Sequence, residues 1–337
     1  MTYINDLVNL MQEEEYDEDY ISLCKSYALK LIENKLPVIF DFTHLSLLLG
    51  YEPSVIAYYL FAEEDEFYTE FNIIKKNGTK RQINVPSERL MDIQRWILDN
   101  ILNLYQLSEH CFGFRKGKSV YDNAIVHVNQ PCIINIDIKN FFPTIKQKDV
   151  FNVFYSKGYS KKVSYYLSKL TTKNNILPQG APTSPMISNI VAAKLDKRLS
   201  CLGEKFYARY TRYADDITFS GEKNIKNIIP IVKEIIKDTG FHVNEDKTRY
   251  AYSYQRQEVT GLTVNRKVNI SKQYLKELKK EIYFCKTYGV NSHLEYMKIT
   301  KSFYKEHLYG KVQWVEMINK ELGVKLFNEL NQIEWEY

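Results

Sequence analysis

The chain has 337 residues, of which 45% are hydrophobic, and this length predicts two or three packed subdomains rather than one core. Its net charge of +5 is unevenly spread: residues 1–70 carry 15 acidic and three basic side chains, so the remainder has an excess of 17 positive charges, which suits a polyanionic partner such as a nucleic acid. Five scattered cysteines argue against a zinc site, and the lack of a secretory leader or of an apolar run of about 18 residues predicts a cytoplasmic protein without a membrane span.

The hydrophobic pattern predicts helical and extended segments along the chain. Apolar residues three and four apart indicate helices over residues 5–34, 43–62, 87–101, 146–157, 161–171, 186–201 and 223–239. Alternating or continuous apolar runs indicate strands over residues 67–75, 81–85, 132–138, 207–213, 217–220, 241–244, 250–254, 258–264 and 267–270. Asn77-Gly78 is typical of a hairpin turn between the first two strands. Prolines and glycines make 174–185 a loop, and the chain from Ser271 onward should be helical and basic.

Two adjacent carboxylates are expected at the tip of a hairpin. Asp215 and Asp216 follow Tyr213-Ala214 between two predicted strands. Like charges about 4 Å apart repel by about 4 kcal/mol at an effective dielectric constant near 20, so a fold that keeps both usually supplies a cation. Because Asp is also common in solvated turns, this tetrapeptide alone leaves both interpretations open.

Asp137 provides a third carboxylate, within Ile136-Asp137-Ile138-Lys139-Asn140-Phe141-Phe142. It ends a strand that is expected to be buried on both faces, where an unpaired carboxylate is costly. It could cap a helix or pair with Lys139, but together with Asp215 and Asp216 it would complete an oxygen-rich site for two Mg²⁺ ions. Two such ions about 3.5–4 Å apart can activate a 3′-hydroxyl and stabilise a leaving pyrophosphate.

Three motifs in this order resemble the palm of reverse transcriptases. They are Asp137 followed by Phe141-Phe142, the loop Leu177-Pro178-Gln179-Gly180-Ala181-Pro182-Thr183-Ser184-Pro185, and Tyr213-Ala214-Asp215-Asp216. Their order and their separations of roughly 40 and 35 residues fit that family. The resemblance covers about residues 67–270, and the C-terminal part matches in general character.

The resemblance implies a role for each matching residue. Asp137, Asp215 and Asp216 would be the catalytic metal ligands, together with the main-chain carbonyl of Ile138. Phe142 falls where the family places its steric gate against a ribonucleotide 2′-hydroxyl, although core packing would also explain it. Further residues that the family uses near the incoming nucleotide or template match Lys80, Arg81, Arg115, Gln179 and Gly180. Taken alone, the basic residues in this set would also fit solvent-exposed positions.

Two further motifs resemble the retron branch of the family. Asn123-Ala124-Ile125-Val126-His127 matches its Asn-Ala-x-x-His motif, and Val259-Thr260-Gly261 matches its Val-Thr-Gly motif. Alone, His127 would more often be a core histidine and Val-Thr-Gly is a common tripeptide, but inside this frame they favour the retron type. Gly261 is expected to permit close backbone approach near the primer end.

Residues 271–337 resemble a thumb in position and helical character. Four lysines in this stretch are spaced to share one helix face: Lys272, Lys276, Lys279 and Lys280. Such a stripe can follow an RNA backbone, and an ordinary solvated helix face is the alternative.

The resemblance implies an α+β fold, a right-hand polymerase with fingers, a palm made of an antiparallel sheet plus helices, and a small helical thumb. The expected boundaries are residues 1–130 for the N-terminal helices and fingers, 131–262 for the palm (with 146–175 contributing to the fingers) and 263–337 for an RNA-binding thumb. The implied activity is that of an RNA-directed DNA polymerase, a nucleotidyltransferase that uses two Mg²⁺ ions and dNTPs. It would copy part of its cognate noncoding RNA, msr-msd, into branched msDNA.

The same resemblance implies a biological setting. Priming would start from the 2′-hydroxyl of a guanosine in the RNA, and the system would act in bacterial defence against phage with an effector protein. Host ribonuclease H would remove the copied RNA, because no ribonuclease H domain is expected after residue 337. Two alternatives are another prokaryotic reverse transcriptase, of the group II intron or abortive-infection type, and a nonenzymatic RNA-binding scaffold. Intron enzymes usually carry a longer maturase region, and the three carboxylates with Gln179-Gly180 disfavour a scaffold.

Overall fold

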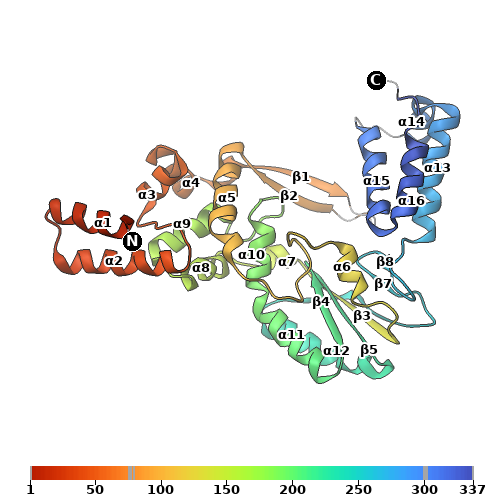
Figure 1. The fold of residues 1–337 in the computed structure, drawn as a ribbon, viewed down its shortest axis with the longest axis horizontal. Coiled ribbons are helices and arrows are strands. Elements are labelled where there is room, and N and C mark those ends of the chain that lie inside the picture. Colours follow the sequence, from red (N-terminus) through yellow and green to blue (C-terminus); the bar gives the residue numbers. More distant parts are fainter. Residues whose placement is uncertain (1, 75–77, 79, 299–302, 336–337) are drawn as a thin grey trace. The chain divides into compact units, whose positions relative to one another are not determined.

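The computed structural model describes residues 2–74, 78, 80–298 and 303–335 (Figure 1). The chain divides into two compact units, each assembled from three segments. The first unit comprises Met1–Phe114, Ile138–Arg198 and Lys233–Val243. The second comprises Arg115–Asp137, Leu199–Val232 and Asn244–Tyr337. None of the helices in these described residues is long and apolar enough to cross a membrane.

The first unit begins with four helices where the periodicity predicted two. They are α1 Thr2–Glu13, α2 Glu18–Glu33, α3 Phe42–Leu49 and α4 Pro53–Phe61. The first break occurs because Asp17 caps α2, accepting a hydrogen bond from the backbone N–H of Asp19. The second occurs because Gly50, at φ 72°, ends α3, and Pro53 then starts α4. The helical prediction is confirmed, and its continuity across both breaks is wrong.

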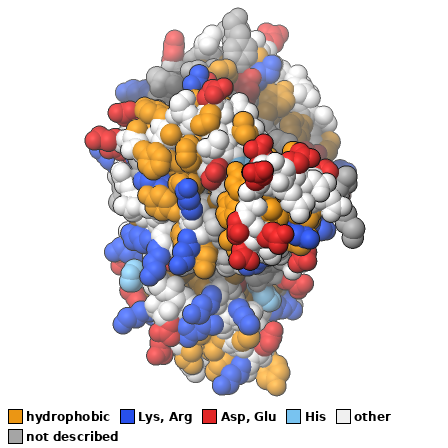
Figure 2. Space-filling model, turned by 90° about the vertical axis from the view of Figure 1, so that its left-hand side faces the viewer, with side chains coloured by type: hydrophobic (Ala, Val, Ile, Leu, Met, Phe, Trp, Pro, Cys, Tyr) orange, Lys and Arg blue, Asp and Glu red, His pale blue; other side chains and the backbone are white. Residues whose placement is uncertain are grey.

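The N-terminal helices expose apolar side chains as well as acids. Figure 2, which faces this side of the molecule, shows apolar and acidic side chains beside one another on the surface. The most exposed large apolar side chains of these helices are Leu10, Leu23, Leu47 and Phe61. Acidic charge of this kind repels a phosphate backbone, so this surface is a poor match for nucleic acid.

A hairpin follows the helices, as the sequence predicted. Strand β1 Tyr68–Ile74 pairs antiparallel with β2 Lys80–Pro86, with Ile74 opposite Lys80. A short 3-10 helix, η1 Glu64–Phe67, leads into it. Gly78 has the positive φ expected of a turn glycine, whereas the other predicted turn residues (76, 77 and 79) lie outside the described part of the chain. Most hairpin side chains are exposed, because β1 buries Tyr68 alone and β2 buries Pro86 alone.

The remaining helices agree with most of the predicted ranges. They are α5 Glu88–Asn100, η2 Leu102–Leu104, α6 Val120–Ile125, α7 Phe141–Thr144, α8 Gln147–Ser156, α9 Lys161–Thr171, α10 Ser184–Val191, α11 Ala193–Lys205, η3 Lys223–Ile228 and α12 Ile229–Asp238. The predicted helix over 186–201 is divided at Ala192, and that over 223–239 starts as a 3-10 helix before Pro230.

A four-stranded antiparallel sheet forms the centre of the second unit. Its strands are β3 Cys132–Ile138, β4 Arg209–Tyr213, β5 Asp216–Gly221 and β6 Val243–Tyr252, in the order β4-β5-β3-β6. Strand β3 is buried along nearly its whole length, as its continuous apolar run predicted. Strand β6 is one strand where the pattern predicted two, over residues 241–244 and 250–254.

The C-terminal part of the second unit is a small hairpin followed by helices. Strands β7 Glu258–Val259 and β8 Leu262–Thr263 are joined by Thr260-Gly261, both at positive φ. The predicted strand over 267–270 is reduced to a bridge between Asn269 and Thr263. The helices that follow are α13 Lys272–Tyr288, α14 Val290–Met297, α15 Tyr304–Ile318 and α16 Lys320–Leu330 (Figure 1). Their buried residues share one core cluster with Ala124 and Val259.

Candidate active site

The turn between β4 and β5 holds the two adjacent carboxylates. Tyr213 lies opposite Asp216, so Ala214-Asp215 form a two-residue turn. Ala214 is buried and has a φ of 56°, a conformation that β-branched side chains avoid. The fully buried Arg212 donates a hydrogen bond of 3.0 Å from Nη1 to the carbonyl oxygen of Ala214. Arg212 therefore supports the turn from the protein interior, a role that could not be predicted from the local sequence.

Asp137 lies opposite Asp216 on the neighbouring strand β3. Its residue surface is 7% exposed, so its charge needs partners. One carboxylate oxygen accepts a hydrogen bond from Asn244 Nδ2 at 2.9 Å, and the other accepts from Lys247 Nζ at 2.8 Å. Both partners come from β6, on the other side of β3. Sequence reasoning missed Asn244 and Lys247, because polar residues on a half-exposed strand give no sign of facing an acid.

The electrostatics of Asp216 reflect its surroundings and the two carboxylates beside it, those of Asp215 and Asp137. Its pKa is raised to about 6, and the largest cause is the protein that crowds its carboxyl group, although the residue keeps exposed surface. The negative charges of Asp215 and Asp137 add to this rise, and Lys247 and Arg249 oppose it. The protein's own cations therefore do not balance the acids of the site.

The donor set fits a hard divalent cation, because carboxylate oxygens are the ligands that such ions prefer. Within the described residues, however, no three His, Cys, Asp or Glu side chains are arranged closely enough to hold a metal ion as they stand. The ammonium of Lys247 instead pairs with one oxygen of Asp137. Its side chain is 56% exposed, so it is free to withdraw from Asp137 when another cation takes its place.

Phe142 belongs to the first unit, in the short helix α7. Its neighbour Phe141 is buried and packs against Phe241, with ring centroids 5.4 Å apart. Phe142 itself is half-buried, and its ring lies 5.6 Å from that of Phe141 and 6.0 Å from that of Phe114. Packing therefore orients this ring without covering it.

The loop of Gln179 and Gly180 lies against strand β2 in the first unit. The backbone N–H of Asn84 donates a hydrogen bond of 2.7 Å to the carbonyl oxygen of Gln179. Gly180 has a φ of 120°, and a Cβ at this position would lie 2.7 Å from the carbonyl oxygen of Asn84. A glycine is therefore required here by both backbone conformation and close approach.

The predicted cationic residues are distributed over both units. Lys80 and Arg81 are exposed on β2, the strand against which the Gln179-Gly180 loop packs. Arg115 belongs to the second unit, where its carbonyl oxygen accepts a hydrogen bond of 3.1 Å from the backbone N–H of Lys118. Strand β2 thus carries Lys80 and Arg81 and also contacts the Gln179-Gly180 loop.

Comparison with known proteins identifies the family. Residues 73–287 match the family described as reverse transcriptase (RNA-dependent DNA polymerase). The chain is 35% identical over 277 residues to the retron Ec86 reverse transcriptase of Escherichia coli, covering 80% of this chain and 82% of the relative. The chain belongs to the retron-type reverse transcriptases. This reverse transcriptase is accordingly an RNA-directed DNA polymerase with an RNA template as its partner, and the α+β right-hand polymerase fold predicted from the sequence is confirmed.

Other relatives agree with this assignment. The enzyme is 34% identical over 254 residues to the retron Mx162 reverse transcriptase of Myxococcus xanthus, covering 66% of this chain and about half, 52%, of that relative. It is 29% identical over 314 residues to the retron Mx65 reverse transcriptase of the same organism, covering 86% and 71%. Among solved structures it is similar to telomerase from Candida albicans in complex with a TWJ fragment of telomeric RNA, with 12% identity, a TM-score of 0.47 and coverage of 79% and 63%.

The two retron-type motifs of this reverse transcriptase meet in the second unit. Asn123, on α6, is buried and its Nδ2 donates a hydrogen bond of 3.5 Å to Thr260 Oγ1, in the β7–β8 turn. Thr260 Oγ1 in turn donates to the carbonyl oxygen of Val120 at 3.5 Å. Ala124 and Val259 are buried in the core cluster that also contains the C-terminal helices. The motifs thus join α6 to the small hairpin that precedes the C-terminal helices α13 to α16.

His127 of the first of these motifs is a buried core residue of the reverse transcriptase. Its Nδ1 is 2.7 Å from Ser220 Oγ and its Nε2 is 2.8 Å from Thr211 Oγ1. Burial lowers its pKa to about 3, and the charge of Arg209 contributes to this. His127 is therefore neutral and ties the end of α6 to strands β4 and β5, outside the group of acids.

The four predicted thumb lysines lie on α13 of the reverse transcriptase. Lys272, Lys276, Lys279 and Lys280 are all exposed, while Leu278 and Ile282 of the same helix are buried in the core. The predicted helical character of this segment is confirmed, and contact of the lysines with RNA stays a prediction.

Proposed function

We propose that this reverse transcriptase copies part of its cognate structured noncoding RNA, msr-msd, into branched msDNA. The observation that carries the proposal is the register that puts Asp137 opposite Asp216, beside the Asp215 turn. Clustered carboxylates that the protein's own cations leave unbalanced are suited to charge-stabilised nucleotidyl transfer. The curated relatives supply the retron context by their names.

In this proposal Asp137, Asp215 and Asp216, with the carbonyl oxygen of Ile138, hold two Mg²⁺ ions. The bound ions would supply activation of the 3′-hydroxyl and stabilisation of the pyrophosphate. Asn244 keeps one oxygen of Asp137 oriented, and Arg212 holds the backbone of the turn. Lys247 neutralises the charge of Asp137 by pairing with its other carboxylate oxygen as long as no metal ion is bound there.

The incoming dNTP would be bound by six residues in this proposal: Lys80, Arg81, Arg115, Phe142, Gln179 and Gly180. Exposed cations such as Lys80 and Arg81 are suited to triphosphate oxygens. The half-buried ring of Phe142 would exclude a 2′-hydroxyl by contact. Close backbone approach at Gly180 would keep the loop flat beneath the nucleotide.

The larger organisation follows the same proposal. Fingers would comprise residues 1–130 with 146–175, the palm 131–262, and the thumb 263–337, with the lysines of α13 on the RNA backbone. Host ribonuclease H would remove copied RNA, and a retron effector protein would complete an anti-phage system. The substrates of this reaction, dNTPs and a transcribed RNA, are cytoplasmic in bacteria.

An extension assay tests the activity at its chemical centre. Purified protein is supplied with copurifying or transcribed RNA, labelled dNTPs and Mg²⁺, and the product is treated with ribonuclease to reveal a branched RNA–DNA hybrid. Asp215→Asn and Asp216→Asn should each abolish label uptake, because each removes a ligand charge. Incorporation that survives in both variants would contradict the site. DNA without a branch point would support polymerase activity and contradict the msDNA product.

A further inference from the structure

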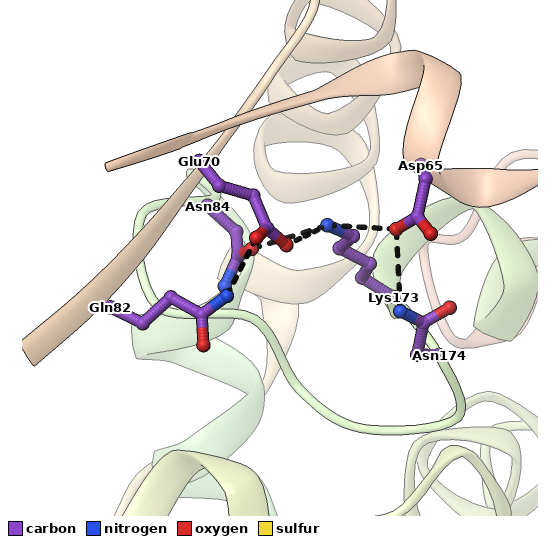
Figure 3. A network of polar contacts seen from close by, with 6 residues as sticks. All are labelled: Asp65, Glu70, Gln82, Asn84, Lys173 and Asn174. Atoms are coloured by element: carbon purple, nitrogen blue, oxygen red, sulfur yellow. Dashed lines mark hydrogen bonds and ion pairs between the residues drawn. The ribbon is translucent and has the colours of Figure 1, made fainter. Parts of the chain in front are cut away.

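The first unit contains a buried lysine to which the family motifs assign no role. Lys173 follows α9 and is 4% exposed. Its ammonium pairs with the carboxylate of Glu70, lies 3.1 Å from Asp65 Oδ1, and donates a hydrogen bond of 3.3 Å to Asn84 Oδ1 (Figure 3). The consecutive elements η1, β1 and β2 therefore all contact one positive charge from a distant part of the chain.

Two of these partners lie on the two paired strands of the hairpin, so the contact connects both strands to Lys173. Glu70 and Asn84 are opposite each other in the register of β1 and β2, so the ammonium of Lys173 contacts both strands of the hairpin at the same paired position. Gln82 Nε2 donates a hydrogen bond of 2.8 Å to the other oxygen of Glu70. Asn174 Nδ2 donates one of 3.4 Å to Asp65 Oδ1. The carboxylates are thereby oriented toward Lys173 from both sides.

This polar contact replaces hydrophobic anchoring that the hairpin lacks. Strand β1 exposes every residue after Tyr68, and the ammonium of Lys173 lies 5.5 Å from the centre of the Tyr68 ring. Burial alone would lower the pKa of Lys173, but Glu70 and Asp65 overcome this and raise the pKa above its ordinary value. The lysine therefore stays charged while it is enclosed.

The same strand residue connects Lys173 to the loop of Gln179. Asn84 accepts from Lys173 through its side chain and donates to the carbonyl oxygen of Gln179 through its backbone. Lys173 and Ile176 also exchange two backbone hydrogen bonds, of 2.9 and 3.0 Å, which close the start of the loop into a tight turn. Loop and hairpin are thus joined at two points that share Asn84.

We propose that Lys173 is a positioning residue that fixes the hairpin on the Gln179-Gly180 loop and thereby sets where Lys80 and Arg81 meet the nucleotide. This inference rests on the proposed function of those residues. Lys173 touches no substrate in this account and acts through Glu70 and Asn84. Its loss should weaken nucleotide capture more than chemistry, because the β4–β5 turn and Asp137 keep their own supports, Arg212 and Asn244.

Steady-state kinetics of Lys173→Met test the role in the full-length enzyme. Methionine keeps the length of the side chain and removes its charge. We expect the KM for dNTP to rise about tenfold with kcat changed less than about twofold. Lys162→Met, an exposed position on the same α9, is the matched control and should leave both constants unchanged. Equal losses in kcat and kcat/KM, with KM unchanged, would overturn the proposal.

Glu70→Gln provides a second test through the partner. It should also raise the KM for dNTP. The double variant should raise the KM by less than the product of the two single effects, because both substitutions remove the same contact between Lys173 and Glu70. Strictly multiplicative effects would contradict a shared contact.

Hydrogen exchange separates this inference from the proposed function, because it needs no activity. The amide of Asn84, bonded to Gln179, should lose protection in Lys173→Met and keep it in Lys162→Met. Unchanged protection would overturn the positioning role. Wild-type enzyme that incorporates no dNTP would instead overturn the proposed function, and with it the kinetic consequence assigned to Lys173.

Discussion

At the scale of single residues, Asp216 shows how the acidic site lowers the stability of the protein that carries it. Its folded-state pKa of about 6 lies above the value of 3.8 for an unperturbed Asp. Between these two pH values the folded state binds more protons than the unfolded state, so stability falls as pH rises from about 4 to about 6. Above pH 6 Asp216 is ionised in both states, and the loss of stability from its ionisation is complete.

Asp216→Asn should therefore stabilise the metal-free protein at pH 7.5 while abolishing polymerisation. We expect a rise in Tm of roughly 1–2 °C, the shift that about 1 kcal/mol produces in a protein of 337 residues. The gain should shrink toward pH 4, where Asp216 of the wild type is protonated. Differential scanning fluorimetry in EDTA measures it, with Asp246→Asn, an exposed acid on β6, as the control. A Tm that falls at pH 7.5 would contradict this account.

His127 should give the protein a sensitivity to acid. Its pKa is about 3 in the folded state against 6.5 when unperturbed, so the unfolded state binds the proton first as pH falls below 6.5. Stability should drop by up to about 1.4 kcal/mol per pH unit from this group. His127→Gln should flatten the dependence of the urea midpoint on pH between 6.5 and 5. His242→Gln, at an exposed position, should leave it unchanged, and an equal slope in His127→Gln would refute the prediction.

Phe142→Ala should relax discrimination against ribonucleotides. The half-buried ring is oriented by Phe141 and Phe114, and removing it opens the space that a 2′-hydroxyl would need. We expect the preference for dNTP over rNTP, as a ratio of kcat/KM values, to fall at least about tenfold. Phe151→Ala, on α8, controls for loss of an aromatic ring elsewhere in the same unit. An unchanged ratio would discard the gate.

At the scale of elements, the segments that can be predicted from the sequence are those whose local hydrophobic pattern matches their burial in the fold. Strand β3 follows from the apolar run Cys132–Ile138, and the β4–β5 hairpin follows from two β-like runs around the acids. Strand β6 was predicted as two because Glu245, Asp246 and Lys247 interrupt its apolar pattern. Strand formation there depends on backbone pairing with β3, which local hydropathy does not report.

The supports of the site were harder to predict than its acids. The three carboxylates are recognisable because their residue types and order form motifs. Arg212 and Lys173 are charged residues that the pattern would place in solvent, and both are buried. Arg212 bonds to the carbonyl oxygen of Ala214, two residues away, whereas the partners of Lys173 come from segments far from it in the sequence. Such partners become visible after the chain has folded, since nothing in the neighbouring residues indicates them.

The Gln179-Gly180 loop offers a test of close packing between elements. Gly180→Ala places a Cβ 2.7 Å from the carbonyl oxygen of Asn84, so the loop must shift away from β2. We expect kcat/KM for dNTP to fall at least about tenfold. Gly240→Ala is the matched control, because it has a similarly positive φ of 87° with nothing within 4 Å of the added Cβ. If both variants lose activity equally, backbone strain rather than the contact is responsible.

At the scale of the whole molecule, charge is divided between an acidic N-terminal region and a basic remainder. The lysines of α13 should contribute to RNA affinity through counterion release. Lys276→Gln with Lys280→Gln should weaken binding of the cognate RNA and reduce the slope of log K against log salt by about 0.7–0.9 per lysine. Lys25→Gln with Lys35→Gln, exposed in the acidic region, should not alter the slope. Equal slopes for both double variants and the wild type would contradict a role for α13.

The division of each unit into three segments governs how the protein is made. The first unit closes with Lys233–Val243, so the ribosome must deliver 243 residues before that unit has all of its chain. At about 5–20 residues per second this takes roughly 12–50 s. During this time the first two segments of the unit cannot pack against the third, which is not yet translated. The unit's core therefore assembles late in synthesis, and a gene cut before this point would encode a nascent chain that cannot finish folding.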